Sequence, residues 1–242
     1  NHQLTIHPEL PDLHPGCREG NLKDNPVFED LRDSLKFVRV DFSLNIILDN
    51  QGRIVQAVAG DWAAAHQKGC QMVDHLYRIP IQQKADLVMV SCGGHPRDIN
   101  FIQAHKAIQH GFYALKPGGT LIILAQCPEG IGSESFLEWF DYPDIKTTHQ
   151  ALLENFKING NTALSLRQKT SQAHLILVSD LNPHVVQKMG MMAARTMEEA
   201  YHQALKFLPK DYQIIVIPNG SLTVPWLKEM SSGTPAEEPH IS

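Results

Sequence analysis

Two polar residues three positions apart, Gln103 and Lys106, are the first candidates for chemistry in this chain. They fall in a helical pattern over residues 100–115, and a spacing of three places them on one face of a helix. An amide beside a lysine ammonium group is suited to hold a carboxylate and a neighbouring hydroxyl or carbonyl oxygen. Lysine is usually exposed, so the same spacing also fits two solvated side chains without a function.

A glycine loop comes directly before this helix. The apolar run 85–90 predicts a buried strand, and Gly93 and Gly94 follow it in the loop 92–98. Glycine permits positive φ and close backbone approach, and a helix N-terminus offers free N–H groups to an anion. We therefore expect the backbone at Gly93 and Gly94 to bind substrate. The loop matches neither the dinucleotide fingerprint nor the P-loop.

The rest of the second half also predicts an α/β fold. A strand, a helix and a strand without apolar–polar alternation, over 85–125, are typical of a βαβ unit in a buried parallel sheet. Further strands are expected at 173–178 and 212–217, and further helices at 134–140, 149–156 and 185–207. Loops after parallel strands share one edge of the sheet, so 92–98, 127–133 and 180–183 are expected to meet there. Cys127, which ends a strand, is expected to be an inert buried thiol.

The first 80 residues have an α+β pattern with an irregular start. The expected elements are an irregular segment at 1–30, a short helix from Asn25-Pro26, a hairpin at 37–59, a helix after Asp61 and a break at 78–83. The predicted fold class is therefore α/β, a Rossmann-like layered domain with a mostly parallel sheet preceded by an α+β segment. The expected divisions are 1–80, 81–226 and a disordered tail at 227–242.

Composition narrows the classes of function. A net charge of −5 and a pI of about 6.2 give no reason to expect nucleic-acid binding, which needs a clustered positive surface. No apolar run approaches the roughly 20 residues that span a bilayer, so no membrane partner is expected. The four cysteines form no C-x-x-C pair, and we expect reduced thiols in a cytoplasmic protein.

Histidines are the remaining candidates for metal binding. His95 and His105 are ten positions apart, a spacing without a recognised ligand geometry, and are expected to be ordinary polar residues. His2, His7 and His14 form a loose cluster in the irregular opening segment. Spacing alone leaves a three-histidine site there open.

Several ordered segments of the chain carry a family resemblance. They are Gly93–Ala107 (GGHPRDINFIQAHKA), Leu115–Thr120 (LKPGGT), Cys127–Gly132 (CPEGIG), Asn1-His2, Gly20-Asn21 and Asn25–Val27. Together they resemble the C-terminal part of the nickel-dependent lactate racemase family, over most of residues 1–225.

The resemblance implies a racemase or epimerase of a 2-hydroxy acid. The family uses a nickel pincer nucleotide, a pyridinium with thio groups tethered to a lysine, and acts by transient hydride transfer through a 2-keto intermediate. Gln103 and Lys106 match the family's pair that contacts substrate or its keto form. His2 matches the nickel-ligating histidine, and imidazole suits that metal.

The resemblance also implies that many of the catalytic and cofactor-binding residues lie outside this chain. The cofactor-bearing lysine, the two acid/base histidines and the substrate-binding Asp and Arg belong to an upstream segment that this chain lacks. We therefore expect a fragment, with residues 1–80 as the trailing part of the N-terminal catalytic domain, which alone is inactive and free of cofactor. Ile102 stands where the lactate enzyme has tyrosine, so we expect a different or bulkier 2-hydroxy acid.

Two other classes of function fit the residues without the resemblance. One is a non-catalytic α/β binding module whose glycine loops hold an anionic metabolite. The other is an unrelated α/β transferase that binds phosphate at the same helix N-terminus.

Overall fold

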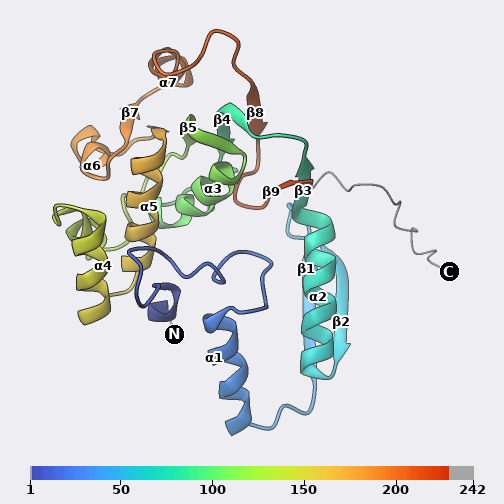
Figure 1. Ribbon diagram of the computed structural model, residues 1–242. Helices are drawn as coiled ribbons and strands as arrows, with labels where there is room; N and C mark the ends of the chain where they lie inside the picture. Colours follow the sequence, from blue (N-terminus) through green and yellow to red (C-terminus); the bar gives the residue numbers. More distant parts are fainter. Residues whose placement is uncertain (1, 229–242) are drawn as a thin grey trace.

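A five-stranded parallel sheet organises the second half of the chain in the computed structural model, which describes residues 2–228 (Figure 1). The strand order is β7-β6-β5-β4-β8, and every neighbouring pair is parallel. The strands are β4 (Ala85–Ser91), β5 (Leu115–Leu124), β6 (His174–Val178), β7 (Met192–Ala194) and β8 (Ile214–Ile217). The predicted mixed α/β class is confirmed.

Helices cover both faces of this sheet. They are α3 (Phe101–Tyr113), η3 (Leu137–Phe140), α4 (Ile145–Glu154), α5 (Gly160–Gln172), α6 (Pro183–Lys188) and α7 (Met197–Ala204). Along β5, Leu121 and Ile123 join the core under α3 and α5, whereas Ile122 joins the core under α7. A strand with apolar residues on both faces is buried on both sides, which explains the continuous apolar runs in the sequence.

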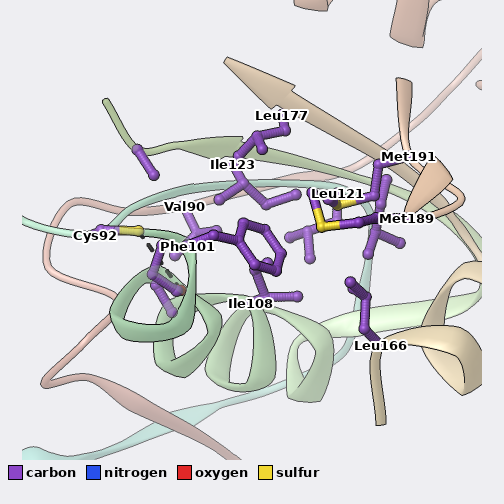
Figure 2. Packing of buried hydrophobic residues seen from close by; sticks show 14 of the residues in the cluster. Val90, Cys92, Phe101, Ile108, Leu121, Ile123, Leu166, Leu177, Met189 and Met191 are labelled. Atoms are coloured by element: carbon purple, nitrogen blue, oxygen red, sulfur yellow. Dashed lines mark hydrogen bonds between the residues drawn. The ribbon is translucent and has the colours of Figure 1, made fainter. Parts of the chain in front are cut away.

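Close packing fixes α3 against the sheet. Phe101 is fully buried at its first turn and points between the helix and the strands (Figure 2). A Cβ at Gly111 would lie 2.8 Å from Leu121 Cδ1, so the absence of a side chain permits this approach. The position of α3 is therefore well determined by its apolar face.

The first part of the chain forms a helix, a hairpin and a second helix. The elements are η1 (His2–Thr5), α1 (Pro26–Ser34), η2 (Leu35–Phe37), β1 (Ser43–Leu48), β2 (Ile54–Gly60) and α2 (Trp62–Tyr77). The Asn25 side chain caps α1, the Asp61 side chain caps α2, and β1 pairs with β2 antiparallel. These features were predicted because caps and hairpin turns are local signals.

The break expected at 78–83 is wrong. Residues Arg78–Ile81 form β3, which pairs in parallel with β9 (Val224–Leu227). Neither four-residue strand was predicted, because each is stabilised by a partner far away in the sequence. Of the tail expected at 227–242, Leu227 belongs to β9, and residues 229–242 lie outside the described part of the chain.

Helix α5 was not predicted either. Its buried face includes Gly160, Ser165 and Lys169 beside the apolar residues, so the sequence shows little amphipathic periodicity. The helical stretch expected at 185–207 is interrupted by β7, and the one expected at 134–140 is limited to the short η3. Within residues 2–228, no helix is long and apolar enough to cross a membrane.

Candidate functional site

Gln103 and Lys106 lie on the exposed side of α3, as predicted from their spacing. The opposite side, with Phe101, Ala104 and Ile108, is fully buried against the sheet. Lys106 Nζ donates a hydrogen bond to Gln103 Oε1 over 2.8 Å, so the two side chains form a joined pair. Gln103 is half-buried and Lys106 is exposed.

This pair presents several donors to an approaching ligand. A lysine ammonium has three N–H bonds, and one of them is used on Gln103 Oε1. The Gln103 Nε2 group makes no hydrogen bond to another of residues 2–228. Because the Gln103 acceptor atom is already engaged, what the pair offers outward is an amide N–H donor and a positive charge. That combination suits a carboxylate with an adjacent oxygen.

The N-terminus of α3 does not offer free N–H groups, so the expected anion site there is wrong. The first two helical N–H groups, of Phe101 and Ile102, donate to the carbonyls of Gly130 and Ile131 at 3.0 and 3.1 Å. The third, of Gln103, donates to its N-cap Asn100 Oδ1 at 3.0 Å. The loop after β5 therefore folds back onto this helix end and satisfies it. Because these N–H groups are already hydrogen-bonded, the structure also argues against a transferase that binds phosphate at this helix N-terminus.

The two glycines after β4 differ in their surroundings. Both have positive φ, 92° at Gly93 and 72° at Gly94, as their residue type predicts. A Cβ at Gly93 would meet Asn219 Oδ1 at 3.0 Å and Arg97 Nη1 at 3.3 Å, whereas Gly94 is exposed with open space around its Cα. Gly94 thus has the more accessible backbone of the two.

Three loops meet at the carboxyl edge of the sheet, as predicted. The Gln126 N–H donates to Asp98 Oδ2 at 3.1 Å, and the Gln126 side chain donates to Asp180 Oδ2 at 3.0 Å. Asp98 is buried at this junction. Nearby Cys127 is buried, and burial raises its thiol pKa to about 12, which agrees with an inert residue.

The three-histidine metal site is not formed. His7 Nδ1 accepts backbone N–H groups of Glu9 and Leu10, and His14 Nδ1 accepts that of Gly16, so these two rings cap local turns. Within residues 2–228, no group of three or more His, Cys, Asp or Glu side chains could hold a metal. His2, in η1, is exposed, and its ring makes no hydrogen bond within that range.

The other two histidines considered as metal ligands, His95 and His105, lie in different environments. His95 is exposed in the glycine loop. His105 instead faces α5, where burial, then the charges of Lys169 and His110, hold its pKa well below the usual value. A neutral His105 is therefore a structural residue next to the pair rather than part of it.

A large cavity lies away from Gln103 and Lys106. It measures about 1170 Å³ and separates the helix–hairpin–helix part from the end of α3 and β9. On the α2 side of this cavity, His66, Cys70 and Asp74 occur at a spacing of four, which places them on one helix face and is readable in the sequence. Either ring nitrogen of His66 lies 3.8 Å from Cys70 Sγ.

The fold and the pair define a class, an open parallel α/β protein with polar side chains presented by the helix after a central strand. A profile of the lactate racemase C-terminal domain matches residues 81–224, more than half of the chain. The chain therefore belongs to the lactate racemase family.

Individual relatives agree with this family. Lactate racemase of Thermoanaerobacterium thermosaccharolyticum is 32% identical over 213 residues, which cover 86% of this chain and 50% of the relative. Lactate racemase of Lactiplantibacillus plantarum is 31% identical over 212 residues, which cover 85% and 50%. This chain thus spans about half the length of the curated relatives that it matches. Both relatives act as racemases, and the family is one of isomerases.

Solved structures give the same relationship. The structure of the lactate racemase apoprotein from Thermoanaerobacterium thermosaccharolyticum superposes with a TM-score of 0.82 at 32% identity, over 88% of this chain and 52% of that one. A Thermotoga maritima protein solved by structural genomics has a TM-score of 0.58 at 14% identity, over 85% and 54%, and supports the fold alone.

Proposed function

We propose that this chain is the C-terminal portion of a 2-hydroxy acid racemase or epimerase that uses a nickel pincer nucleotide. The observation that carries the proposal is the Gln103–Lys106 pair, held at 2.8 Å on α3 within the part that matches the lactate racemase C-terminal domain. The Lys106 ammonium binds the substrate carboxylate, and the Gln103 amide donates to the oxygen on C2. Gly93 and Gly94 add backbone contacts at the same edge of the sheet.

The two side chains act by fixing a planar intermediate. Racemisation requires that C2 becomes flat and is attacked from the other face, while the carboxylate stays in place. The Lys106 ammonium bound to the carboxylate and the Gln103 amide bound to the C2 oxygen hold the plane of the intermediate. The Gln103 amide can still donate a hydrogen bond when the C2 hydroxyl has become a keto oxygen. The chemistry supplied by the bound cofactor is reversible hydride acceptance from C2.

One residue of this chain, His2, fits the role of a nickel ligand for such a cofactor. His2 is exposed with an uncommitted imidazole, and it is a single candidate ligand rather than one of a cluster among residues 2–228. An imidazole would suit the nickel of such a cofactor as a ligand from the protein. His2 would hold the metal, and the remaining residues that carry the cofactor would come from the part of the protein that this chain lacks.

An exposed apolar surface on the hairpin supports the proposal that a further segment of the protein packs on it. In β1, Leu44 and Ile46 are 60% and 45% exposed on one side, and Phe42 just before the strand is 64% exposed. A hairpin with an open apolar face gains stability when another element covers it. We propose that residues 1–80 continue a catalytic domain whose other segments cover this face. The four free cysteines are compatible with a cytoplasmic protein.

Isotope retention in the complete gene product, loaded with nickel cofactor, tests the reaction. A 2-hydroxy acid deuterated at C2 is incubated in ordinary water, and the inverted product is analysed by mass spectrometry. Hydride return predicts that the product keeps most of its deuterium. Loss of the label to solvent during inversion would show proton abstraction instead, and binding without inversion would favour the binding module.

A further inference from the structure

Residues 2–19 are attached to the α/β part of the molecule as well as to the helix that follows them. We call residues 2–19 the strap. It runs along α4 and α5 before the chain turns toward α1 (Figure 1). Ile6 is only 4% exposed and belongs to the same core cluster as Phe101 and Leu164. An apolar anchor of this kind ties the strap to the sheet-and-helix core.

The strap is folded on itself as a small closed loop. Ile6 and Leu13 form an antiparallel bridge. The His7 N–H donates to the Asp12 carbonyl at 2.9 Å, and the His14 N–H donates to the Thr5 carbonyl at 2.8 Å. The strap therefore has backbone hydrogen bonds of its own that report on its order.

Side chains of α4 and α5 hold this loop from the other side. His149, only 5% exposed, places Nε2 2.7 Å from the His7 carbonyl, and because a carbonyl only accepts, Nε2 carries the proton. Gln168 Nε2 donates to Asp12 Oδ1 at 2.6 Å and to the Pro11 carbonyl at 3.2 Å. These bonds join segments more than 140 residues apart in the sequence.

The strap also contacts the part that follows it. Helix α1 packs on η1, but α1 has no buried residue. The large cavity has Glu19 on the strap side and Phe28 and Val73 on the other side. A direct hydrogen bond between the hairpin and the α/β part is that of Arg97 Nη2 with the Asn50 carbonyl, at 2.9 Å.

We propose that Ile6, His149 and Gln168 are positioning residues that fix the strap on the α/β part and so set the place of His2 relative to Gln103 and Lys106. The inference rests on the proposed function, in which His2 is the nickel ligand. It refines the expected division at residue 80, because the segment with the metal ligand is then attached to the part that carries the substrate pair.

Hydrogen exchange tests the attachment without any cofactor. Three variants are compared with the wild type, in this chain and in the complete gene product. His149→Phe keeps the ring but removes the donor, and His149→Gln restores a donor. Gln150→Ala is the matched control, because the Gln150 side chain on the same helix is exposed and donates to Glu154. Peptides over residues 5–14 should exchange about tenfold faster in His149→Phe, and close to wild type in the other two.

Two results would overturn the attachment. One is a wild-type strap that exchanges as fast as an unstructured peptide, and the other is unchanged exchange in His149→Phe. Peptides from β4 and β5 report whether a variant is folded, and Gln168→Ala serves as the second variant should His149→Phe fail to fold.

Nickel release from the complete, loaded protein separates this inference from the proposed function. The expected result is faster nickel loss in His149→Phe, near wild-type loss in His149→Gln, and little retained nickel in His2→Ala. Loss in His2→Ala with no change in His149→Phe would overturn the positioning role alone. Full nickel retention in His2→Ala would overturn the ligand assignment and the role of the strap together.

Discussion

Lys106 Nζ lies 2.8 Å from Gln103 Oε1, and this hydrogen bond joins two side chains on one face of α3. The bond occupies one lone pair of the Gln103 carbonyl oxygen, and the other polar groups of the pair are N–H donors and a positive charge. An anionic ligand with an adjacent oxygen is favoured for that reason, and a cationic one is disfavoured.

Replacement of the amide tests the role of Gln103. In the complete, loaded protein, Gln103→Ala removes a donor to the C2 oxygen, and we expect kcat/KM for racemisation to fall by about 10- to 100-fold. The helix should remain folded, because alanine is a good helix former at a position outside the core. Gln150→Ala on α4 is the matched control, and equal activity in the two variants would remove Gln103 from the site.

The chain by itself is expected to be inactive. Within residues 2–228, His2 is an isolated candidate ligand, and no group of three or more His, Cys, Asp or Glu side chains could hold a metal. The purified 242-residue protein should therefore show no racemisation and far less than one equivalent of nickel by elemental analysis. Measurable racemisation or stoichiometric nickel would contradict the proposal that the remaining groups lie elsewhere in the protein.

Gly132 is expected to be essential for the loop that covers the N-terminus of α3. Its φ is +82°, and a Cβ there would lie 2.3 Å from Asn100 Cγ, the residue that caps the helix. Gly132→Ala should lower the free energy of unfolding by more than about 2 kcal/mol. Gly118→Ala, with φ +73° and no atom within 4 Å, should cost only about 1 kcal/mol of backbone strain. Equal costs in chemical denaturation would show that the contact with Asn100 is unimportant.

Stability should depend on pH through Lys169. This side chain is 6% exposed, and burial lowers its pKa from 10.5 to about 8, although Glu19 and Asp12 partly oppose the shift. Below pH 8 both the folded and unfolded states are protonated, and the folded protein carries the full cost of a buried charge. As pH rises from 8 to 10.5 the folded state loses its proton first, so this cost disappears.

Comparison with Lys169→Met isolates that contribution from other titrating groups. The difference in unfolding free energy, Lys169→Met minus wild type, should decrease by about 3 kcal/mol between pH 8 and pH 10.5. Lys146→Met, which alters an exposed lysine on α4, should show no such trend. A constant difference across this range would mean that Lys169 titrates normally in the folded protein.

Local signals in the sequence were sufficient for α3 and for the two side chains on it. The spacing of Phe101, Ala104 and Ile108 predicted the buried side, and the position of Gln103 followed from it. The satisfied N-terminus of α3 could not be predicted, because the carbonyls of Gly130 and Ile131 come from the loop of the next strand. These hydrogen bonds depend on the tertiary fold, and no local sequence pattern predicts them.

The same limit explains the missed elements. Strands β3 and β9 exist because they pair with each other across most of the domain, and α5 turns Lys169 inward against the usual preference of lysine. The attachment of the strap likewise depends on His149 and Gln168, which are remote from it in the sequence. Family resemblance supplied the roles proposed for His2, Gln103 and Lys106, which their spacing alone left open.

Chiral analysis of lactate turnover by the complete, nickel-loaded protein tests the central claim most directly. The account predicts that wild type interconverts the two enantiomers of lactate or of a bulkier 2-hydroxy acid, that Lys106→Ala loses at least about 100-fold in kcat/KM, and that Lys146→Ala, an exposed lysine on α4, retains wild-type activity. Racemisation by Lys106→Ala at the wild-type rate, or no inversion of any 2-hydroxy acid by the loaded wild type, would contradict it.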